Sequence, residues 1–479
     1  MAALIMRYIS RGFLQQLKFL RLCQPVTYHD SQKALFHTVT SQKFHLLYKR
    51  GVIQDKFPDE SPDIPFLLDG GKQCIYSGFD PTSDSLHIGN LLVIIVLMHL
   101  QRLGHVILSV IGDATAQIGD PSGRNTERSA LSLLDIHKNS KCIQTDLERL
   151  FENHEKYFWN PSKPKKNLSS VRILHNSEWY NNQDLVTFLS TVGRHFRLGQ
   201  MLSRTSVQNR LNSQEGMSFT EFTYQVFQSF DWLFLYDKYN CRFQVGGSDQ
   251  MGNIHSGHDL INRVRSREVF GITTPLIKSD TGDKYGKTGG SAIWLNPEKT
   301  SPFEFYQFFI RLADRDVEAF LKYFTFLSLQ EIESELQKHM KDPGSRHGQK
   351  TIAKNVTLLV HGEHGLQSAL RATEALFHST PETLVKLNEE ELRQIFQQAT
   401  VVELLLDPGT TVLDMAMRAK CFVNLEDAER IIMAGGFYIN HIRINNPKYV
   451  LIPGQHILPN GISVVRVGKK NYYIIKWLM

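Results

Sequence analysis

The feature that most constrains the fold of this 479-residue chain is a series of short apolar runs separated by stretches that suit helices. Four runs with strand character occupy residues 73–79, 105–111, 171–174 and 242–245. Short strands that alternate with helices are typical of a parallel sheet, because a parallel connection needs a crossover long enough for a helix. We therefore expect an α/β, Rossmann-like domain whose ligands bind beyond the carboxyl ends of the strands.

The rest of the chain divides by composition. Residues 301–385 carry helix signals and almost no strand signals, whereas the segment before residue 410 is rich in charge and glutamine. From residue 411 onward a helical stretch precedes runs of β type. We expect a sheet domain at 43–298, a helical domain at 299–390, a linker at 391–410 and a small α+β domain at 411–479.

Residues 1–42 have the composition of a targeting segment. They contain five basic residues and one acid, which gives a charge of +4. On a helical wheel Ile5 and Ile9 fall on one side and Arg7 and Arg11 roughly opposite. This pattern predicts a mitochondrial transit peptide and residence in the mitochondrial matrix. The alternative is a basic arm that binds RNA or a membrane surface.

The net charge of +6 is concentrated at the two ends of the chain. Residues 431–479 hold six basic residues and no acid, and the middle of the chain, 43–430, carries −4. The five cysteines form no CxxC pair, which disfavours a disulfide framework or a thiolate zinc site. The longest apolar run, 91–98, is too short to span a bilayer, so no membrane partner is expected.

Two motifs carry the chemistry. The first, His87-Ile88-Gly89-Asn90, follows the first strand candidate at the expected start of a helix, where amide groups and the helix dipole favour phosphate. The second, residues 284–288 (KYGKT), places two lysines around a glycine, where they can neutralise charge on a transferring phosphate. Taken separately, the first motif could be an N-capping histidine and the second a solvated turn.

The order of these motifs on this fold resembles class I aminoacyl-tRNA synthetases, with their HIGH and KMSKS signatures. Further matches resemble the bacterial-type tyrosyl-tRNA synthetases: residues 76–90, 119–123 (GDPSG), 219–225 (FTEFTYQ) and 244–250 (QVGGSDQ). The resemblance runs from about residue 45 to 479, and the leader favours a mitochondrial member. It implies an enzyme that activates L-tyrosine with ATP and transfers it to the 3′ end of tRNA(Tyr).

The resemblance also implies a tyrosine pocket. Tyr76 and Asp231 would bind the phenol, because a buried donor and acceptor pair is satisfied by a hydroxyl group. The remaining residues implied for tyrosine are Asp120, Tyr224 and Gln228 at the amino group, Gln244 and Gln250 in the pocket wall, and the more remote Asn176. Tyr224, Gln228 and Asp231 have the spacing i, i+4, i+7, which places them on one helix face.

The same resemblance implies the residues for ATP, which would be a substrate together with Mg²⁺; no protein-bound metal is predicted. They are Asp80, Thr82, His87, Gly89 and Asn90 near the first motif, Gly247 and Asp249 at the ribose, Arg124 and Arg128 at the pyrophosphate, and Lys284, Lys287 and Thr288 on the second motif. The sequence departs from the family pattern at Ser77, Asn90, Met251 and Tyr285, none of which removes a charged catalytic group.

Two further expectations concern partners. Residues 411–479 resemble an S4-type RNA-binding domain, in which we expect Tyr472 and Tyr473 to belong to a terminal core strand whose alternate residues face inward and outward, so that a tyrosine could also stack on bases. The family functions as a homodimer, with the interface expected in an insertion at about 134–202. The competing interpretations are a tryptophanyl-tRNA synthetase, which shares the fold, and an RNA-binding protein on a synthetase scaffold.

Overall fold

The computed structural model describes residues 42–59, 61–124, 126–160, 167–181, 183–277, 292–377, 400–468 and 471–478. The predicted transit peptide, apart from its last residue, and the predicted 284–288 motif lie outside these residues, as does the first part of the predicted linker.

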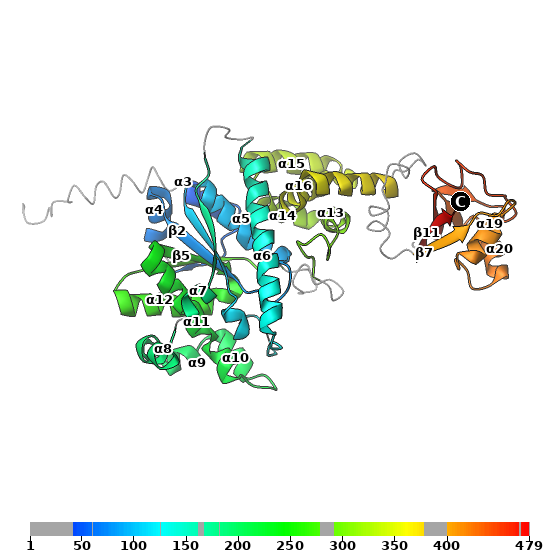
Figure 1. Ribbon diagram of the computed structural model, residues 1–479. Coiled ribbons are helices and arrows are strands. Elements are labelled where there is room, and N and C mark those ends of the chain that lie inside the picture. The colour runs from blue at the N-terminus through cyan, green and yellow to red at the C-terminus, as the bar shows by residue number, and fades with distance from the viewer. Residues whose placement is uncertain are drawn as a thin grey trace, which may run out of the picture.

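A six-stranded sheet forms the centre of the larger part of the molecule (Figure 1). Its strands, in spatial order, are β1 (Lys56–Phe57), β6 (Phe270–Thr274), β5 (Cys241–Gly247), β2 (Cys74–Phe79), β3 (Val106–Ile111) and β4 (Val171–His175). All neighbours are parallel except β1, which pairs antiparallel with β6. The Rossmann-like sheet and its four predicted strands are confirmed, and β1 and β6 were missed. From β2 the chain adds β3 and β4 on one side, and it then adds β5 and β6 on the other side. The strand order therefore reverses between β2 and β5, and parallel sheets bind ligands at such a point.

Successive residues of each strand point to opposite faces of this sheet, and each face has its own helices. Ile75 and Ile107 pack with α5 (Ile88–Arg102) and α6 (Leu133–Asn153). Tyr76 and Leu108 pack on the other face with α11 (Phe219–Tyr239) and α12 (Met251–Arg265). The apolar run 91–98 is therefore a buried helix between the sheet and its neighbours. Among the described residues, no helix is long and apolar enough to cross a membrane.

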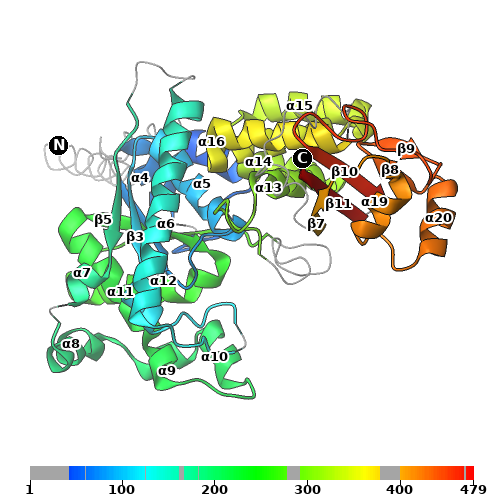
Figure 2. The ribbon, with the colours of Figure 1, turned by 45° about the vertical axis from the view of Figure 1, so that its right-hand side comes forward.

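The smaller helices of this part surround the sheet. They are α3 (Gln42–Lys49), α4 (Asp63–Gly70), α7 (Ser177–Tyr180), α8 (Leu185–Thr191), α9 (Leu198–Leu202) and α10 (Thr205–Leu211), with short turns η1 (Thr115–Gln117), η2 (His154–Trp159), η3 (Gly193–His195) and η4 (Ser248–Gln250). In Figures 1 and 2, α8, α9 and α10 lie at the bottom of the molecule, away from the later helices. The predicted insertion at 134–202 needs correction, because two elements within it belong to the central domain. β4 is a strand of the sheet, and α6 packs against one face of the sheet.

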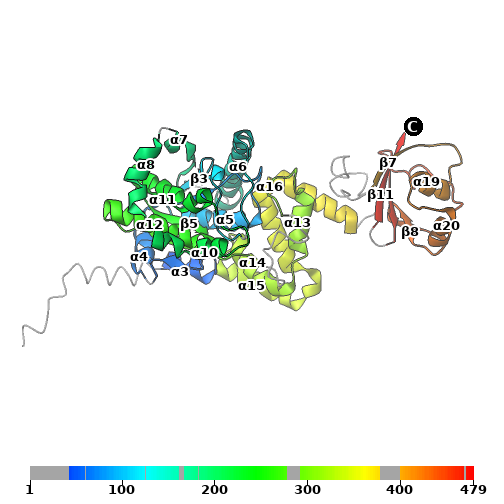
Figure 3. The ribbon, with the colours of Figure 1, turned by 90° about the horizontal axis from the view of Figure 1, so that it is seen from below.

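Residues 302–377 form a helical layer beside the sheet (Figure 3). Its elements are α13 (Pro302–Ile310), η6 (Asp314–Asp316), α14 (Val317–Phe324), α15 (Leu329–Lys341), η7 (Pro343–Ser345) and α16 (His347–Phe377). Ser301 starts α13 with a capping box, and Pro302 occupies the first turn, where its missing N–H costs nothing. Aromatic side chains of α13 and α14 belong to one core cluster with β2, α5 and α6, so the core is continuous across the predicted boundary at 298/299.

The C-terminal residues form a separate five-stranded sheet in the order β7-β11-β10-β8-β9. Its elements are β7 (Thr400–Leu405), α19 (Val412–Arg418), α20 (Leu425–Met433), β8 (Phe437–Ile439), β9 (Ile442–Ile444), β10 (Ile462–Val467) and β11 (Asn471–Leu478). The predicted linker is wrong at its end, because β7 pairs in parallel with β11 over six residues. Its sequence, TVVELL, is β-type, but the charged stretch before it masked that signal.

Candidate active site

A cavity of 650 Å³ opens at the carboxyl ends of β2 and β5, where the strand order changes direction. It is lined by residues of the first motif, of the segment 244–250 and of α11. All the predicted site residues that the structure describes, except Asn176, line this one cavity: Tyr76, Asp80, Thr82, His87, Gly89, Asn90, Asp120, Arg124, Arg128, Tyr224, Gln228, Asp231, Gln244, Gly247, Asp249 and Gln250. Lys284, Lys287 and Thr288 lie outside the described residues.

One end of the cavity combines a buried hydroxyl group with a buried carboxylate. Tyr76 is 2% exposed, and its Oη has no hydrogen-bond partner in the part of the chain that the structure describes. Asp231 on α11 accepts hydrogen bonds from Trp179 Nε1 at 2.8 Å and from Asn176 Nδ2 at 3.2 Å. Burial raises the pKa of Asp231 to about 7, although these hydrogen bonds act in the opposite direction. A donor and an acceptor at the end of an apolar pocket fit a phenol.

Asn176 lies behind this carboxylate and does not line the cavity. Its side chain is fully buried, accepts a hydrogen bond from the amide of Ala114 at 2.8 Å and donates to Thr115 Oγ1 at 3.0 Å. The same amide nitrogen donates to Asp231. Asn176, which the resemblance implied for tyrosine, therefore contacts the Asp231 carboxylate and does not face the cavity.

The middle of the cavity is acidic. Tyr224 Oη donates to Asp80 Oδ2 at 2.7 Å, and Thr115 Oγ1 donates to Asp80 Oδ1 at 2.8 Å. Burial raises the pKa of Asp80 to about 6. Asp120 accepts a hydrogen bond from Gln250 Nε2 at 2.7 Å. The structure thus groups Asp80, which was expected at ATP, with side chains expected at the amino group of tyrosine, and two carboxylates suit a bound cation.

The other end of the cavity is the N-terminus of α5. His87 caps this helix: its Nδ1 accepts hydrogen bonds from the amides of Gly89 at 3.1 Å and Asn90 at 3.4 Å. Asn90 Oδ1 accepts in return from the amide of His87 at 3.1 Å. A neutral ring that accepts at Nδ1 carries its proton on Nε2, so it can donate to an anion. The capping interpretation and the phosphate-binding interpretation are therefore compatible.

At two positions in the motifs, a steric reason requires glycine. A Cβ atom at Gly89 would lie 2.9 Å from Cε1 of the His87 ring, so any other residue would push the ring out of place. A Cβ atom at Gly247 would lie 2.7 Å from Oδ1 of Asp249. Both glycines keep a neighbouring polar side chain in its position at the cavity wall.

Arg124 and Arg128 supply the positive charge that the described residues place at this cavity wall. Arg128 Nε donates to the backbone carbonyl of Asp120 at 3.4 Å. Burial, together with the nearby charge of Arg128, lowers the pKa of Arg124. An anion at this position would relieve the repulsion between the two guanidinium groups. In the described parts of the chain, no group of three or more His, Cys, Asp or Glu side chains converges as a metal site.

Three residues that the sequence did not indicate complete the site. Thr115 and Trp179 hold Asp80 and Asp231, and Asn253 Nδ2 donates to Asp120 Oδ1 at 3.4 Å. Thr115 comes four residues after β3, at the edge where polar residues of a parallel sheet gather, and this position was a usable signal. No comparable pattern marks Trp179 or Asn253.

Comparison with known proteins identifies the class. Residues 69–378, more than half of the chain, match the family described as tRNA synthetases class I (W and Y). The solved structure of a C-terminally truncated mitochondrial tyrosyl-tRNA synthetase from Aspergillus nidulans is similar to this chain, with a TM-score of 0.64 and 31% identity, over 73% of this chain and all of that one. The chain therefore belongs to the class I tRNA synthetases.

Within that class the curated relatives are specific. A mitochondrial tyrosine–tRNA ligase of Drosophila melanogaster is 53% identical over 444 residues, which cover 92% of this chain and 96% of the relative. A mitochondrial tyrosine–tRNA ligase of Homo sapiens is 47% identical over 484 residues, with complete coverage of both chains. These similarities put the chain among the tyrosyl-tRNA synthetases, which activate tyrosine and attach it to tRNA, and not among the enzymes for tryptophan.

Proposed function

We propose that the cavity binds tyrosine with its phenol between Tyr76 and Asp231 and its ammonium group beside Asp80 and Asp120. The observation that carries this assignment is the buried Oη of Tyr76, which lacks a partner among the described residues in a pocket that also holds the Asp231 carboxylate. A buried donor of this kind is stable only if a ligand or a water molecule pairs with it. Tyr224 and Gln228 lie on the same face of α11 and complete the amino-group site.

ATP, as its magnesium complex, occupies the His87 end of the same cavity. The tyrosine carboxylate attacks the α-phosphorus in line, the bond to the β-phosphate oxygen breaks, and pyrophosphate leaves. The 3′-terminal ribose hydroxyl of tRNA(Tyr) then takes the tyrosyl group from the adenylate. No side chain acts as a nucleophile, so catalysis depends on positioning and on charge stabilisation by Thr82, His87, Arg124, Arg128 and the 284–288 motif.

One experiment tests the assignment against its competitors. Amino-acid-dependent exchange between ATP and pyrophosphate is measured with tyrosine, phenylalanine and tryptophan in turn. We expect exchange with tyrosine alone. Exchange with tryptophan would mean that the pocket was misassigned, and no exchange with any of the three would favour an RNA-binding protein on a synthetase scaffold.

The affinity for tyrosine should depend on pH through Asp80. A cationic amino group prefers the ionised carboxylate, and the pKa of Asp80 in the free enzyme is about 6. Protons therefore compete with tyrosine below that pH, and we expect the Kd to rise about tenfold per pH unit as the pH falls below 6. Fluorescence titration between pH 5 and pH 8 measures this dependence. Asp80→Asn should bind weakly at every pH and should lose the transition near pH 6, so that any change left near pH 7 belongs to Asp231; a transition near pH 6 that persisted in this variant would contradict the assignment.

The C-terminal sheet domain binds tRNA(Tyr). Two observations support this proposal. Basic residues cluster after residue 431, and on the sheet the Cζ atom of Arg466 lies 4.0 Å from the centroid of the Tyr438 ring. Removing residues 400–479, which takes the whole sheet including β7, should lower tRNA charging at least ~100-fold and change tyrosine-dependent exchange less than ~twofold. Charging and exchange assays on one preparation give both numbers. Loss of exchange would mean that the domain supports the catalytic fold instead.

We also propose a homodimer in the mitochondrial matrix. Apolar side chains of α8 are unusually exposed, with Leu185 at 71% and Val186 at 72%, and Leu198 on α9 is also exposed. Exposed apolar groups gathered on neighbouring helices are typical of an interface. Sedimentation equilibrium that gave the mass of a single chain at micromolar concentration would exclude the dimer.

The proposed location in the mitochondrial matrix has its own test. A reporter fused to residues 1–45 that stayed in the cytosol would exclude import.

A further inference from the structure

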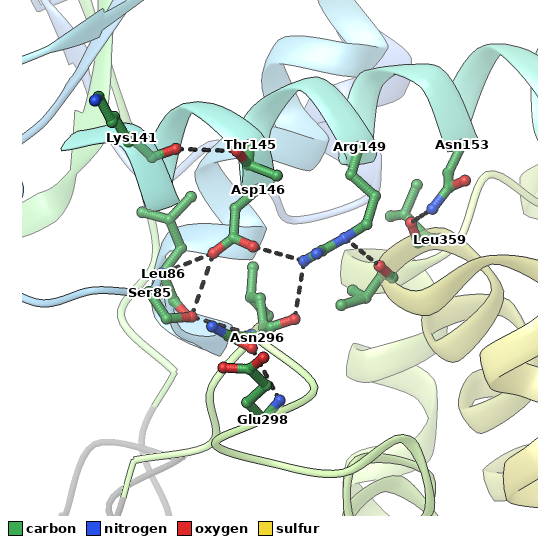
Figure 4. Close-up of polar contacts among 12 residues, drawn as sticks. Ser85, Leu86, Lys141, Thr145, Asp146, Arg149, Asn153, Asn296, Glu298 and Leu359 are labelled. Atoms are coloured by element: carbon green, nitrogen blue, oxygen red, sulfur yellow. Dashed lines mark hydrogen bonds and ion pairs between the residues drawn. The ribbon is translucent and has the colours of Figure 1, made fainter. Parts of the chain in front are cut away.

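An ion pair on α6, with a buried carboxylate and a half-buried guanidinium group, lies between the first motif and the helical layer. Asp146 and Arg149 are one turn apart, with 2.6 Å between Asp146 Oδ1 and Arg149 Nη2. Asp146 is 3% exposed. In Figure 4 both side chains lie below α6, with Ser85 and Leu86 on one side and Leu359 of α16 on the other. Removing a charge from water is costly unless the charge is paired and hydrogen-bonded. The groups that hydrogen-bond to each member of this pair therefore indicate which segments the pair holds together.

The carboxylate holds the segment that leads into the His87 cap. Asp146 Oδ2 accepts hydrogen bonds from Ser85 Oγ at 3.3 Å and from the amide of Leu86 at 3.4 Å. Ser85 Oγ also accepts from the amide of Asn296 at 3.0 Å. Because Ser85 and Leu86 directly precede His87, Asp146 fixes the direction in which the chain enters α5.

The guanidinium group holds the segment on the other side of His87. Arg149 Nη2 donates to the carbonyl of Leu295 at 3.0 Å. Residues 293–295 run antiparallel to 86–88, and the two segments exchange backbone hydrogen bonds of 2.9 and 3.1 Å. His87 and Trp294 are directly opposite in this bridge, with their ring centroids 6.2 Å apart. His87 is thus held between two segments, each bonded to one member of the pair.

A third set of contacts joins the pair to the helical layer. Gly362 interrupts α16 with a φ of 66°, which breaks the helical hydrogen-bond pattern around it. Two carbonyls before the break accept from α6 side chains instead: Leu359 from Asn153 Nδ2 at 2.9 Å and Val360 from Arg149 Nε at 3.0 Å. Arg149 therefore contacts Asp146, residue 295 and α16 at once, because the donors of a guanidinium group are spread over a planar fork, whereas those of an ammonium group all lie on one nitrogen.

We propose that Asp146 and Arg149 are positioning residues for His87, holding the phosphate end of the active site against the helical layer. Neither lines the cavity, so neither contacts a substrate there. This inference rests on the proposed role of His87 at ATP. Their hydrogen bonds run to the α5 cap and not to Tyr76 or Asp231, so their loss should affect adenylate formation and spare tyrosine binding.

Substitutions of Arg149 test the inference. Arg149→Met, which keeps most of the volume, should slow adenylate formation about tenfold and change the tyrosine Kd less than about twofold. Arg149→Lys keeps the charge but loses the planar fork of donors, and its rate should fall between those of Arg149→Met and the unchanged enzyme. Stopped-flow fluorescence gives the rate and equilibrium dialysis the Kd. Glu148→Ala, an exposed carboxylate on the same helix, is the matched control and should change neither quantity. Equal losses of rate and of tyrosine affinity would reduce Arg149 to a structural role.

A double-mutant cycle decides whether the pair acts through His87. In the His87→Ala background, Arg149→Met should lower the rate of adenylate formation less than about twofold, because the group that it positions is gone. The full tenfold effect in that background would overturn the proposal. If Arg149→Met does not fold, Arg149→Lys and Asp146→Asn carry the same cycle. Failure of the proposed function is recognised separately, because the unchanged enzyme would then show no tyrosine-dependent exchange.

Discussion

Replacing His87 by alanine should slow tyrosyl-adenylate formation ~100-fold to ~1000-fold and leave the tyrosine Kd within about twofold. The ring accepts two amide hydrogen bonds at Nδ1, so its proton is on Nε2, and it stands at the positive end of α5. A donor fixed in this way stabilises charge on the transferring phosphate without reorganisation. Single-turnover measurements at saturating tyrosine and ATP give the rate, and equilibrium dialysis gives the Kd.

Two further substitutions separate the cap from the catalytic role. Alanine removes both the acceptor that caps α5 and the Nε2 donor. His87→Asn keeps an acceptor near the Nδ1 position, so it should retain the melting temperature and lose as much rate as alanine. His87→Gln places an amide nitrogen near the Nε2 position and should retain more of the rate than asparagine does. A rate restored by asparagine would show that capping α5 is the main contribution of His87.

The elements with strong local patterns were predictable from the sequence. β2 and β3 are short, largely apolar runs that are mostly buried on both faces, as central strands of a parallel sheet are, and α5 is apolar over residues 91–98. β6 was missed because Gly271 and two threonines dilute its five residues, and β1 is too short to carry a pattern. β6 pairs with the edge of β5, and β1 pairs in turn with β6, so both strands have a tertiary reason and not a local one.

The site divides in the same way. Residues that face the cavity, such as Tyr76 and His87, stand in motifs whose chemistry the sequence displays. Residues that hold them do not: Trp179 is 52 positions from Asp231, and Asp146 is 61 positions from Ser85. Only the fold brings these partners together, and a lone tryptophan or an i, i+3 ion pair on a helix has an ordinary structural meaning when it is seen in sequence. Sequence therefore indicates which groups react and gives little about what positions them.

Substitution of either residue at the phenol end should weaken tyrosine binding, but the two substitutions should differ in their effect on the stability of the fold. Asp231→Asn should raise the Kd for tyrosine about 100-fold, because it removes the carboxylate and also disturbs its neighbours. Both oxygens of Asp231 accept hydrogen bonds from buried donors, Trp179 Nε1 and Asn176 Nδ2. An asparagine must turn its own amide donor toward one of them, so the protein should lose stability as well, on the order of 1–3 kcal/mol for one unpaired buried group.

Tyr76→Phe provides the matched contrast. Its Oη has no hydrogen-bond partner among the described residues, so removing it leaves no protein group unpaired and the melting temperature should stay the same or rise. Only the contact with the substrate is lost, and we expect the Kd for tyrosine to rise about tenfold. Calorimetry and tyrosine titration at pH 8, where Asp231 is ionised, measure both quantities. If Tyr76→Phe lowered the melting temperature as much as Asp231→Asn, the hydroxyl would belong to the fold, and Asp231 alone would select the phenol.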